Sequence, residues 1–389
     1  MLKYLNKDLN LAILLFAIFL NYLLFIPGYF EILIKINFSF FIFFSIFYLI
    51  INNDNKYLTM FIILIVLINL GTPTISWDAR SIWIFKAKQI FFENSILHIK
   101  YNYAPFSNLQ YPNIVPAFSA GFAKLIGHWN EIFPKLGNTL FLIPGFFLFS
   151  RFFKNNYFLM LLIFTIFVLG KLLIDGTLDG ILSIYFASCM LIFFKIKYLS
   201  YDSYDYILLL AFCIILPLLK LEGIFLLLSI LASTLIIFFY KKKINVFLIL
   251  ITIISFIPII LWHLFSFKVL INVTENQNIF NYINFFENIL LYENYYLILK
   301  YLFLNEKFLL SLSFFIISIF FINIDKKPGL SFVILTVFLY LIILFLVYMS
   351  TSLDIEWHLN SSATRVIKPI SLLLFVFSIY NIAPHDTKV

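Results

Sequence analysis

The chain has 389 residues, of which 63% are hydrophobic and 12% are charged, and its mean hydropathy is +1.02. A soluble domain carries roughly 25% charged residues, so this composition excludes a soluble enzyme, a disordered protein and a nucleic-acid-binding domain. The net charge of +8 indicates a basic inner membrane face or an anionic ligand. The two cysteines, Cys189 and Cys213, lie in apolar runs, and we interpret them as core residues rather than a disulfide or a metal site.

Twelve apolar runs are long enough to cross a membrane as helices, which takes about 20 residues each. The runs are 9–26, 32–51, 57–75, 130–151, 156–174, 179–197, 205–221, 223–240, 244–265, 307–323, 329–349 and 366–383. We expect an all-α, polytopic transmembrane bundle and a single membrane domain over 1–389, with N-terminal helices in 1–56 and a core in 57–383. The first run is followed by Pro27-Gly28-Tyr29 rather than a small-residue cleavage site, which favours a retained helix.

The orientation follows from the short loops. If the twelve runs alternate, Lys and Arg are densest in the short loops on the side that carries both termini, for example at Lys56, Arg151 and Lys195. By the positive-inside rule this side faces the cytoplasm. Two long stretches, 76–129 and 266–306, then lie outside.

The first outer stretch contains an amphipathic segment, 81–92, which is typical of a helix in the membrane interface. Its apolar members are Ile82, Trp83, Phe85, Ile90 and Phe91, and its polar members are Lys86, Lys88 and Gln89. Residues 111–127 are apolar but contain two prolines, so we expect a juxtamembrane or re-entrant helix rather than a crossing.

The second outer stretch, 266–306, is expected to form a loop with an amphipathic helix. A charged side chain in the hydrocarbon core is costly. Four such residues make a full crossing expensive, namely Glu275, Glu287, Glu293 and Lys300.

Four clusters of ionisable residues fall at membrane depth on this outer face, where charges are functional candidates. The first holds Asp78 and Arg80 after Trp77. It is a catalytic carboxylate site, or a tryptophan anchor with a local ion pair. The second holds Lys171, Asp175 and Asp179 at spacings of four, which would share one face if the helix continued. Gly176 and Gly180 are expected to break it, so that Asp175 caps a loop and Asp179 starts the next helix. The alternative is a Lys171–Asp175 ion pair followed by Asp179 as an N-cap.

The third cluster is Lys220-Leu221-Glu222-Gly223, which is a substrate site or a plain solvated corner. The chain has only 11 glycines, and four of them flank the second and third clusters, which indicates a demand on backbone geometry. They are Gly170, Gly176, Gly180 and Gly223.

The fourth cluster is a compact set of groups that suits an anion. The alternative is a surface histidine and a snorkelling arginine. Its members are Asp354, Glu356, Trp357, His358 and Arg365. The sequence contains no HxxxH, DxD or CxxC spacing and no G-x-S-x-G, P-loop or GxGxxG motif. We therefore expect no soluble nucleotide site and no cofactor, and a divalent metal stays open.

The order of these motifs resembles the GT-C superfamily of integral membrane glycosyltransferases, in particular bacterial members described as mannosyltransferase-like. The resemblance spans roughly residues 57–383. It rests on an acidic residue in the first outer loop (Asp78), an amphipathic segment, the Tyr111-Pro112-x-x-x-Pro116 motif, an apolar stretch ending in Gly127, Asp175 to Asp179-Gly180, Lys220-x-Glu222-Gly223 and Trp357-His358 with Arg365. The chain departs from the family pattern in three ways. Ala79 stands where many members have a second acidic residue, three helices precede Asp78 where members commonly have one, and we expect no soluble C-terminal domain.

The resemblance implies transfer of a sugar, with inversion, from a polyprenyl-phosphate donor to a glycan, lipid or protein acceptor. It places the reaction at the periplasmic face of a bacterial inner membrane. Because the leaving group is a stable anion, one carboxylate base suffices, and Asp78 is the candidate. The cations that would hold the phosphate are Arg80, Lys86, Lys220, His358 and Arg365. The carboxylates that would contact the sugar or orient the cations are Asp175, Asp179 and Glu222.

Two other classes of protein fit a polytopic chain with buried charges. One is a lipid-linked glycan flippase or secondary transporter, and the other is a membrane-embedded assembly subunit. Transporters tend to show internal repeats and broken helices near the bilayer midplane. Here the charges gather at one face and no repeat is visible, which favours the enzyme.

Overall fold

The computed structural model describes residues 7–26, 28, 30–51, 56–97, 107–108, 110–153, 155–199, 201–241, 245–270, 282–322 and 327–383. Pro27, Tyr29 and Glu275, on which expectations above rest, lie outside these ranges. Within them the chain is helical and contains no strand, which confirms the all-α prediction.

The helices follow one another with short connections. They are α1 (Lys7–Leu24), α2 (Glu31–Ile51), α3 (Lys56–Gly71), η2 (Ala79–Trp83), α4 (Ile84–Glu93), α5 (Ile114–Ile126), α6 (Ile132–Leu140), α7 (Ile143–Phe152), α8 (Asn155–Leu169), η5 (Gly170–Leu173), α9 (Asp179–Tyr198), α10 (Ser203–Leu219), α11 (Leu221–Lys241), α12 (Val246–Ile254), α13 (Ile257–Leu270), α14 (Tyr282–Ile289), α15 (Tyr292–Phe303), α16 (Glu306–Ile319), α17 (Lys327–Met349), α18 (Ile355–Val366) and α19 (Lys368–Ile382).

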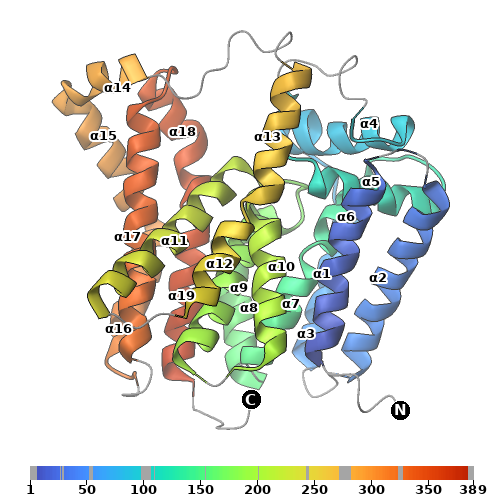
Figure 1. Cartoon of the computed structure of the whole chain (residues 1–389), viewed down its shortest axis with the longest axis horizontal. Coiled ribbons are helices and arrows are strands. Elements are labelled where there is room, and N and C mark those ends of the chain that lie inside the picture. Colours follow the sequence, from blue (N-terminus) through green and yellow to red (C-terminus); the bar gives the residue numbers. More distant parts are fainter. Residues whose placement is uncertain are drawn as a thin grey trace.

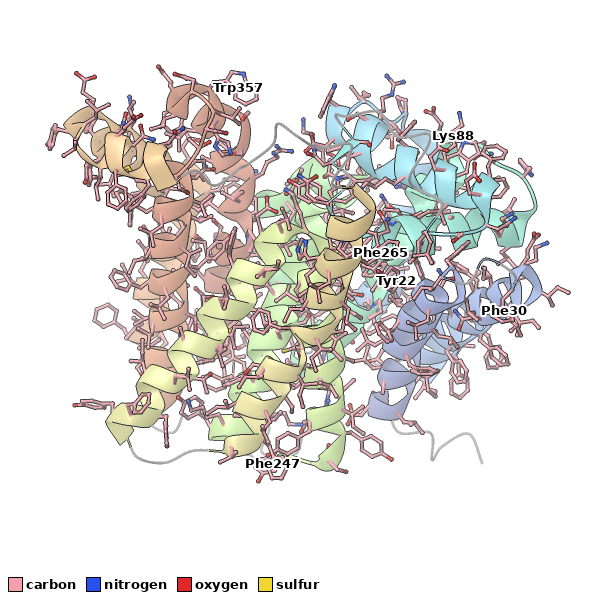
Figure 2. All side chains as sticks on the ribbon, turned by 45° about the horizontal axis from the view of Figure 1, so that its top comes forward. Tyr22, Phe30, Lys88, Phe247, Phe265 and Trp357 are labelled. Carbon is pink, nitrogen blue, oxygen red and sulfur yellow. The ribbon has the colours of Figure 1, made fainter. Side chains whose placement is uncertain are left out.

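The long helices stand side by side as a bundle, with α9 and α19 near its centre (Figure 1). The whole apolar span of α9 is buried, whereas peripheral helices such as α2 and α12 leave apolar side chains uncovered. Figure 2 shows Phe30 and Phe247 pointing away from the bundle, and they are 42% and 67% exposed. An exposed apolar sheath around a buried helix is the arrangement expected of a protein surrounded by lipid.

Fewer helices than expected are long enough to span a membrane. By length and composition, nine of the described helices or joined helix pairs qualify, or ten if α15 and α16, which meet at 63°, count as one span. Two of the twelve expected runs correspond to α3 and α10, which have 16 and 17 residues. At about 1.5 Å per residue these helices are about 24 and 26 Å long, against roughly 30 Å of hydrocarbon. The prediction of a polytopic helix bundle is confirmed, and nine or ten of the twelve expected runs are long enough to span a membrane.

Residues 111–127 contain an apolar helix that is too short to count among the candidate membrane spans. The helix here, α5, has 13 residues, which span about 20 Å. It is buried against α1, α2, α4 and α6. Asn21 of α1 donates a hydrogen bond to the carbonyl of Ala117 at 3.0 Å, which ties α5 to the bundle.

The bundle has two distinct faces. In Figure 1, α1 begins and α19 ends at the lower face, whereas α4, α14 and α18 lie at the upper face. In Figure 2, Lys88 of α4 and Trp357 of α18 mark this upper face. Ion pairs join Asp78 and Asp179 to Arg365 in the last turn of α18, and Lys220 to Asp179, so members of the four ionisable clusters lie together.

Candidate functional site

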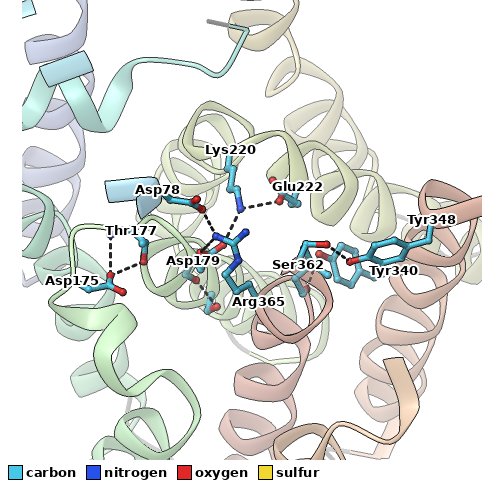
Figure 3. A network of polar contacts seen from close by, with 12 residues as sticks. Asp78, Asp175, Thr177, Asp179, Lys220, Glu222, Tyr340, Tyr348, Ser362 and Arg365 are labelled. Carbon is cyan, nitrogen blue, oxygen red and sulfur yellow. Dashed lines mark hydrogen bonds and ion pairs between the residues drawn. The ribbon is translucent and has the colours of Figure 1, made fainter. Parts of the chain in front are cut away.

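Five charged side chains from four parts of the chain meet at the upper face (Figure 3). Asp78 immediately precedes η2, and Asp179 opens α9. Lys220 joins α10 to α11, and Glu222 lies in the first turn of α11. Arg365 lies in the last turn of α18. We call these five residues the charge cluster.

Ion pairs link the charge cluster into one continuous chain. The Lys220 Nζ atom lies 2.9 Å from Asp179 Oδ1 and 2.9 Å from Glu222 Oε1. The guanidinium of Arg365 pairs with Asp78 Oδ2 and lies 3.9 Å from Asp179 Oδ2. Asp179 therefore bridges both cations. Three carboxylates and two cations give the cluster a formal charge of −1.

One end of the charge cluster is more accessible than the other. The side chains of Asp179 and Lys220 are 4% and 7% exposed, whereas those of Asp78 and Arg365 are 20% and 30% exposed. A molecule that approaches from the upper face therefore meets Asp78 and Arg365 first. The Asp179–Lys220 pair forms the floor of the site.

Lys220 is held in its charged form. Burial alone opposes a charged ammonium, but the carboxylates of Asp179 and then Glu222 outweigh it and raise the pKa of Lys220 well above its ordinary value. This lysine is therefore a permanent cation at physiological pH.

The turn that carries Lys220 and Glu222 depends on two special residues. Pro217 lies in the last turn of α10, where its missing N–H weakens the helix, and Lys220 then adopts an extended backbone with φ −161°. The amide of Gly223 bonds back to the carbonyl of Lys220 at 2.9 Å. A Cβ atom on Gly223 would collide with the carbonyl of Leu216. Glycine thus lets α11 begin directly against the end of α10.

The loop at residues 175–177 packs against Ala79, the residue that follows Asp78. Asp175 Oδ1 accepts hydrogen bonds from the amide and hydroxyl of Thr177, at 2.9 and 2.6 Å. Gly176 has a φ of +83°, and a Cβ atom there would lie 3.2 Å from that of Ala79, the neighbour of Asp78. Burial raises the pKa of Asp175, and the bonds from Thr177 oppose this shift. The loop therefore packs closely beneath the residue next to Asp78.

Asp175 serves this loop and is not part of the charge cluster (Figure 3). The expected break of the helix is confirmed, because the turn at Gly176 separates Asp175, which serves a loop, from Asp179, which begins α9. The alternative of an N-capping Asp179 is wrong, because the N-cap of α9 is Leu178. Asp179 is the first residue of α9, and its carboxylate bonds to Lys220.

Arg365 is positioned by the helix beside it. The hydroxyl of the fully buried Tyr340 in α17 donates to the carbonyl of Val366 at 3.0 Å. At the other end of α18, the carboxylate of Asp354 accepts the amide of Trp357 at 2.8 Å and caps the helix. Both ends of α18 are thus fixed, and Arg365 lies one residue from the Tyr340 contact.

His358 lies beside the charge cluster rather than within it. Its Nδ1 atom is 2.9 Å from the hydroxyl of Thr351, and its ring packs edge-on against Tyr348 at 4.9 Å. The Tyr348 hydroxyl is in turn 2.8 Å from that of Ser362. These contacts orient the imidazole at the margin of the site.

Lys86 does not lie on a polar helix face, and this expectation is corrected. It is completely buried, and its Nζ atom donates to the carbonyls of Asn108 and Tyr111 at 2.7 and 3.0 Å. Burial lowers the pKa of Lys86 well below its ordinary value. The lysine fixes the backbone that carries Tyr111 and is not available to a phosphate.

Arg80 is exposed, and none of the side-chain hydrogen bonds or ion pairs among the described residues involves it. Its neighbour Asp78 pairs with Arg365 instead, so the local Asp78–Arg80 pair considered above does not form.

Two tyrosines at the site escaped the sequence reasoning as individual site residues. Tyr111 is enclosed next to the cluster, where burial and then the charge of Glu222 raise the pKa of its phenol. The sequence feature that could have identified it is the Tyr111-Pro112 motif. Tyr340 carried no signal, because the chain has 23 tyrosines and 52 phenylalanines.

No group of three His, Cys, Asp or Glu side chains within the described ranges is arranged to hold a metal ion. No protein-family model, curated protein or solved structure matches the chain.

Proposed function

We propose that this protein is a membrane glycosyltransferase that moves a sugar from a polyprenyl-phosphate donor to an acceptor at the membrane surface, with inversion at the anomeric carbon. The observation that supports it most is the charge cluster itself. A partly exposed carboxylate, Asp78, pairs with Arg365, and Asp179 links this pair to a second cation, Lys220, at the end of a lipid-facing helix bundle. Charges so placed are costly and are retained mainly for function.

The chemistry needs a base and a cationic partner for the leaving group. An oxygen of the acceptor hydroxyl attacks the anomeric carbon, and its proton passes to the carboxylate of Asp78. The bond from the anomeric carbon to the phosphate oxygen breaks, and its electron pair stays on the phosphate. Arg365 stabilises the charge that develops there. Because the polyprenyl phosphate is a stable anion, no general acid is required.

Arg365 and Asp78 must exchange partners for this reaction. The ion pair between them occupies the carboxylate that serves as base. A donor phosphate offers Arg365 a stronger, bidentate partner, and Asp78 is then free to accept a proton. Donor binding would thus activate the base.

Glu222 suits contact with a sugar. Its Oε1 atom pairs with Lys220, while its buried Oε2 atom has no hydrogen-bond partner among the described residues. A buried acceptor without a donor is costly. A sugar hydroxyl is a donor of the right kind, so we assign Glu222 to substrate binding and Lys220 to holding it in place.

An open apolar pocket that begins about one turn along α11 from Glu222 suits the hydrocarbon chain of the donor. It has a volume of about 500 Å³ and lies between α11, α14 and α17. Its lining includes Phe225, three residues after Glu222, and Val347, next to Tyr348. A chain bound there would leave its phosphate near the charge cluster. The acceptor would arrive from the upper face, which we assign to the outside of a bacterial inner membrane.

The test is transfer by the purified protein in lipid nanodiscs. It is incubated with a panel of polyprenyl-phosphate hexoses and pentoses and with extracts that supply acceptors, and free polyprenyl phosphate is measured. We expect release with at least one donor, its loss in Asp78→Asn, and its retention in Arg80→Gln. Absence of release with every donor, or equal release by Asp78→Asn, contradicts the proposal. In liposomes, movement of the intact donor between leaflets without release would identify a flippase instead.

A further inference from the structure

A second set of buried charges lies at the lower face, opposite the candidate site. Arg151 of α7 lies 2.8 Å from Asp8 of α1 and 3.0 Å from Asp205 of α10. Lys195 of α9 lies 3.0 Å from Asp205. These four side chains are at most 10% exposed, and that of Asp205 is completely buried. The set ties four helices together with a formal charge of zero.

The helices α9 and α10 form a hairpin. The second set of charges lies at one end of this hairpin, and the candidate site lies at the other. At the lower end a cation of α9, Lys195, meets an anion of α10, Asp205. At the upper end an anion of α9, Asp179, meets Lys220, the residue that follows α10. The two helices are therefore joined by an ion pair at each end.

A contact midway along the hairpin shows how α9 and α10 are aligned along their length. The sulfur atoms of Cys189 in α9 and Cys213 in α10 lie 4.0 Å apart. Cys189 lies six residues before Lys195, and Cys213 lies eight residues after Asp205. The contact is thus at a similar height on both helices. A slip of one residue would move one helix by about 1.5 Å relative to the other.

We propose that Asp205 is a positioning residue that sets the register of α9 against α10 and thereby holds Asp179 at the distance from Lys220 that the site needs. The proposal rests on the proposed function only for its effect on sugar transfer. Asp205 suits this role because each of its two carboxylate oxygens has two partners. Oδ1 accepts from Arg151 and Lys195, and Oδ2 accepts from Lys195 and from the amide of Asp202, at 3.0 Å.

The experiment compares Asp205→Asn with a matched control, Asp202→Asn. Both positions belong to the capping box of α10, but Asp202 is exposed and makes no ion pair with the four buried charges among the described residues. The asparagine keeps the size of Asp205 and removes its charge, so Arg151 and Lys195 lose their common partner. Lys195→Met is the second variant. It removes the contact from α9 and leaves the Arg151–Asp205 pair intact.

The first measurement does not depend on enzyme activity. Native membranes are treated with copper–phenanthroline, which takes two electrons from the thiols of Cys189 and Cys213 as two protons leave and the disulfide forms. We expect rapid cross-linking in the wild type and in Asp202→Asn, and a rate lower by about tenfold in Asp205→Asn and Lys195→Met. The chain has two cysteines, so no background cysteine needs removal.

The second measurement is sugar transfer. A displacement of about 1 Å in a positioned site can cost about 10²-fold in rate, so we expect kcat to fall 10- to 100-fold in Asp205→Asn, and Asp205→Glu to recover part of it. Cross-linking of both variants at the wild-type rate overturns the proposal, whatever happens to transfer. Should Asp205→Asn fail to fold, Lys195→Met decides. A wild type that cross-links but transfers no sugar refutes the proposed function and leaves the register assignment supported.

Discussion

Arg365 and Asp78 lie 287 residues apart in the chain, yet the guanidinium of one pairs directly with the carboxylate of the other. The contact joins the last turn of α18 to the residue that precedes η2. It places the most exposed cation of the charge cluster against its candidate base. The predictions below follow from this pairing and from the buried groups around it.

Replacing Asp78 with Asn keeps its size and removes the proton acceptor. We expect the single-turnover rate of transfer to fall about 10²–10⁴-fold, the usual cost of losing a general base. The KM for the donor should not rise, because Arg365 is then free for the phosphate. Arg80→Gln, two residues away on the exposed surface, is the control and should transfer at the wild-type rate. Near-full turnover in Asp78→Asn would make this residue structural, and Asp179 would be the next carboxylate to test.

Replacing Arg365 with Lys keeps the charge and removes the planar fork that binds a phosphate through two hydrogen bonds. A hydrogen bond to a charged group is worth about 1.5–3 kcal/mol, so the KM for the donor should rise by about 10- to 150-fold. Arg80→Lys applies the same change at an exposed arginine and should leave KM unaltered. Titration of the donor in initial-rate assays measures both. An unchanged KM in Arg365→Lys would show that the phosphate binds elsewhere.

Replacing Lys220 with Met leaves the carboxylates of Asp179 and Glu222 without their common partner. Removing one member of a buried ion pair costs about 3–5 kcal/mol, and we expect that loss in the free energy of unfolding. Lys88→Met removes an exposed lysine of α4 and should change stability by less than about 0.5 kcal/mol. Denaturant unfolding in detergent, followed by tryptophan fluorescence, gives both values. An equal free energy of unfolding in the two variants would show that the ion pairs of Lys220 with Asp179 and Glu222 do not stabilise the fold.

Lys86 predicts a specific pH dependence. Its folded-state pKa is well below 10.5, the ordinary value to which it returns on unfolding. Between these two values the unfolded chain binds a proton that the folded chain does not. The wild type should therefore gain stability, relative to Lys86→Met, as the pH rises toward 10.5. Thermal unfolding of both proteins from pH 7 to pH 10 measures the difference. If stability changes with pH in the same way in both proteins, Lys86 remains charged in the folded state.

The sequence predicted which charges share a face, and it did so through topology. Alternating helices place residues that follow upward helices and precede downward helices on the same side, which gathers Asp78, Asp179, Lys220 and Arg365 without any knowledge of their contacts. The glycine signal was also informative. Gly176 and Gly223 stand where a Cβ atom would meet Ala79 or the carbonyl of Leu216.

The sequence could not predict which side chains enter the cluster. Lys86 and Lys88 are two residues apart in one short helix, yet one is buried and the other exposed, because α5 and the segment at Asn108–Tyr111 cover only one side of α4. Such choices depend on tertiary packing, which a local pattern does not contain.

The basic residues that suggested the orientation also have a structural role. Arg151 and Lys195 were counted as charges of short inner loops, but both are buried and paired with Asp205. Their position at the lower face is therefore explained by the packing of four helices as well as by the positive-inside rule.

The pairing of Arg365 with Asp78 has a consequence for how the chain is made. Helices enter a membrane in the order of synthesis, so Asp179, Lys220 and Glu222 can neutralise one another as soon as α9, α10 and α11 are together. Asp78 has been inserted long before, and its cation emerges only with α18. A nascent chain halted before α18 would hold all three carboxylates of the cluster and one of its two cations. Asp78 therefore lacks its partner until Arg365, 287 residues further along the chain, is synthesised, and the ion pair forms only when α18 packs against the earlier helices.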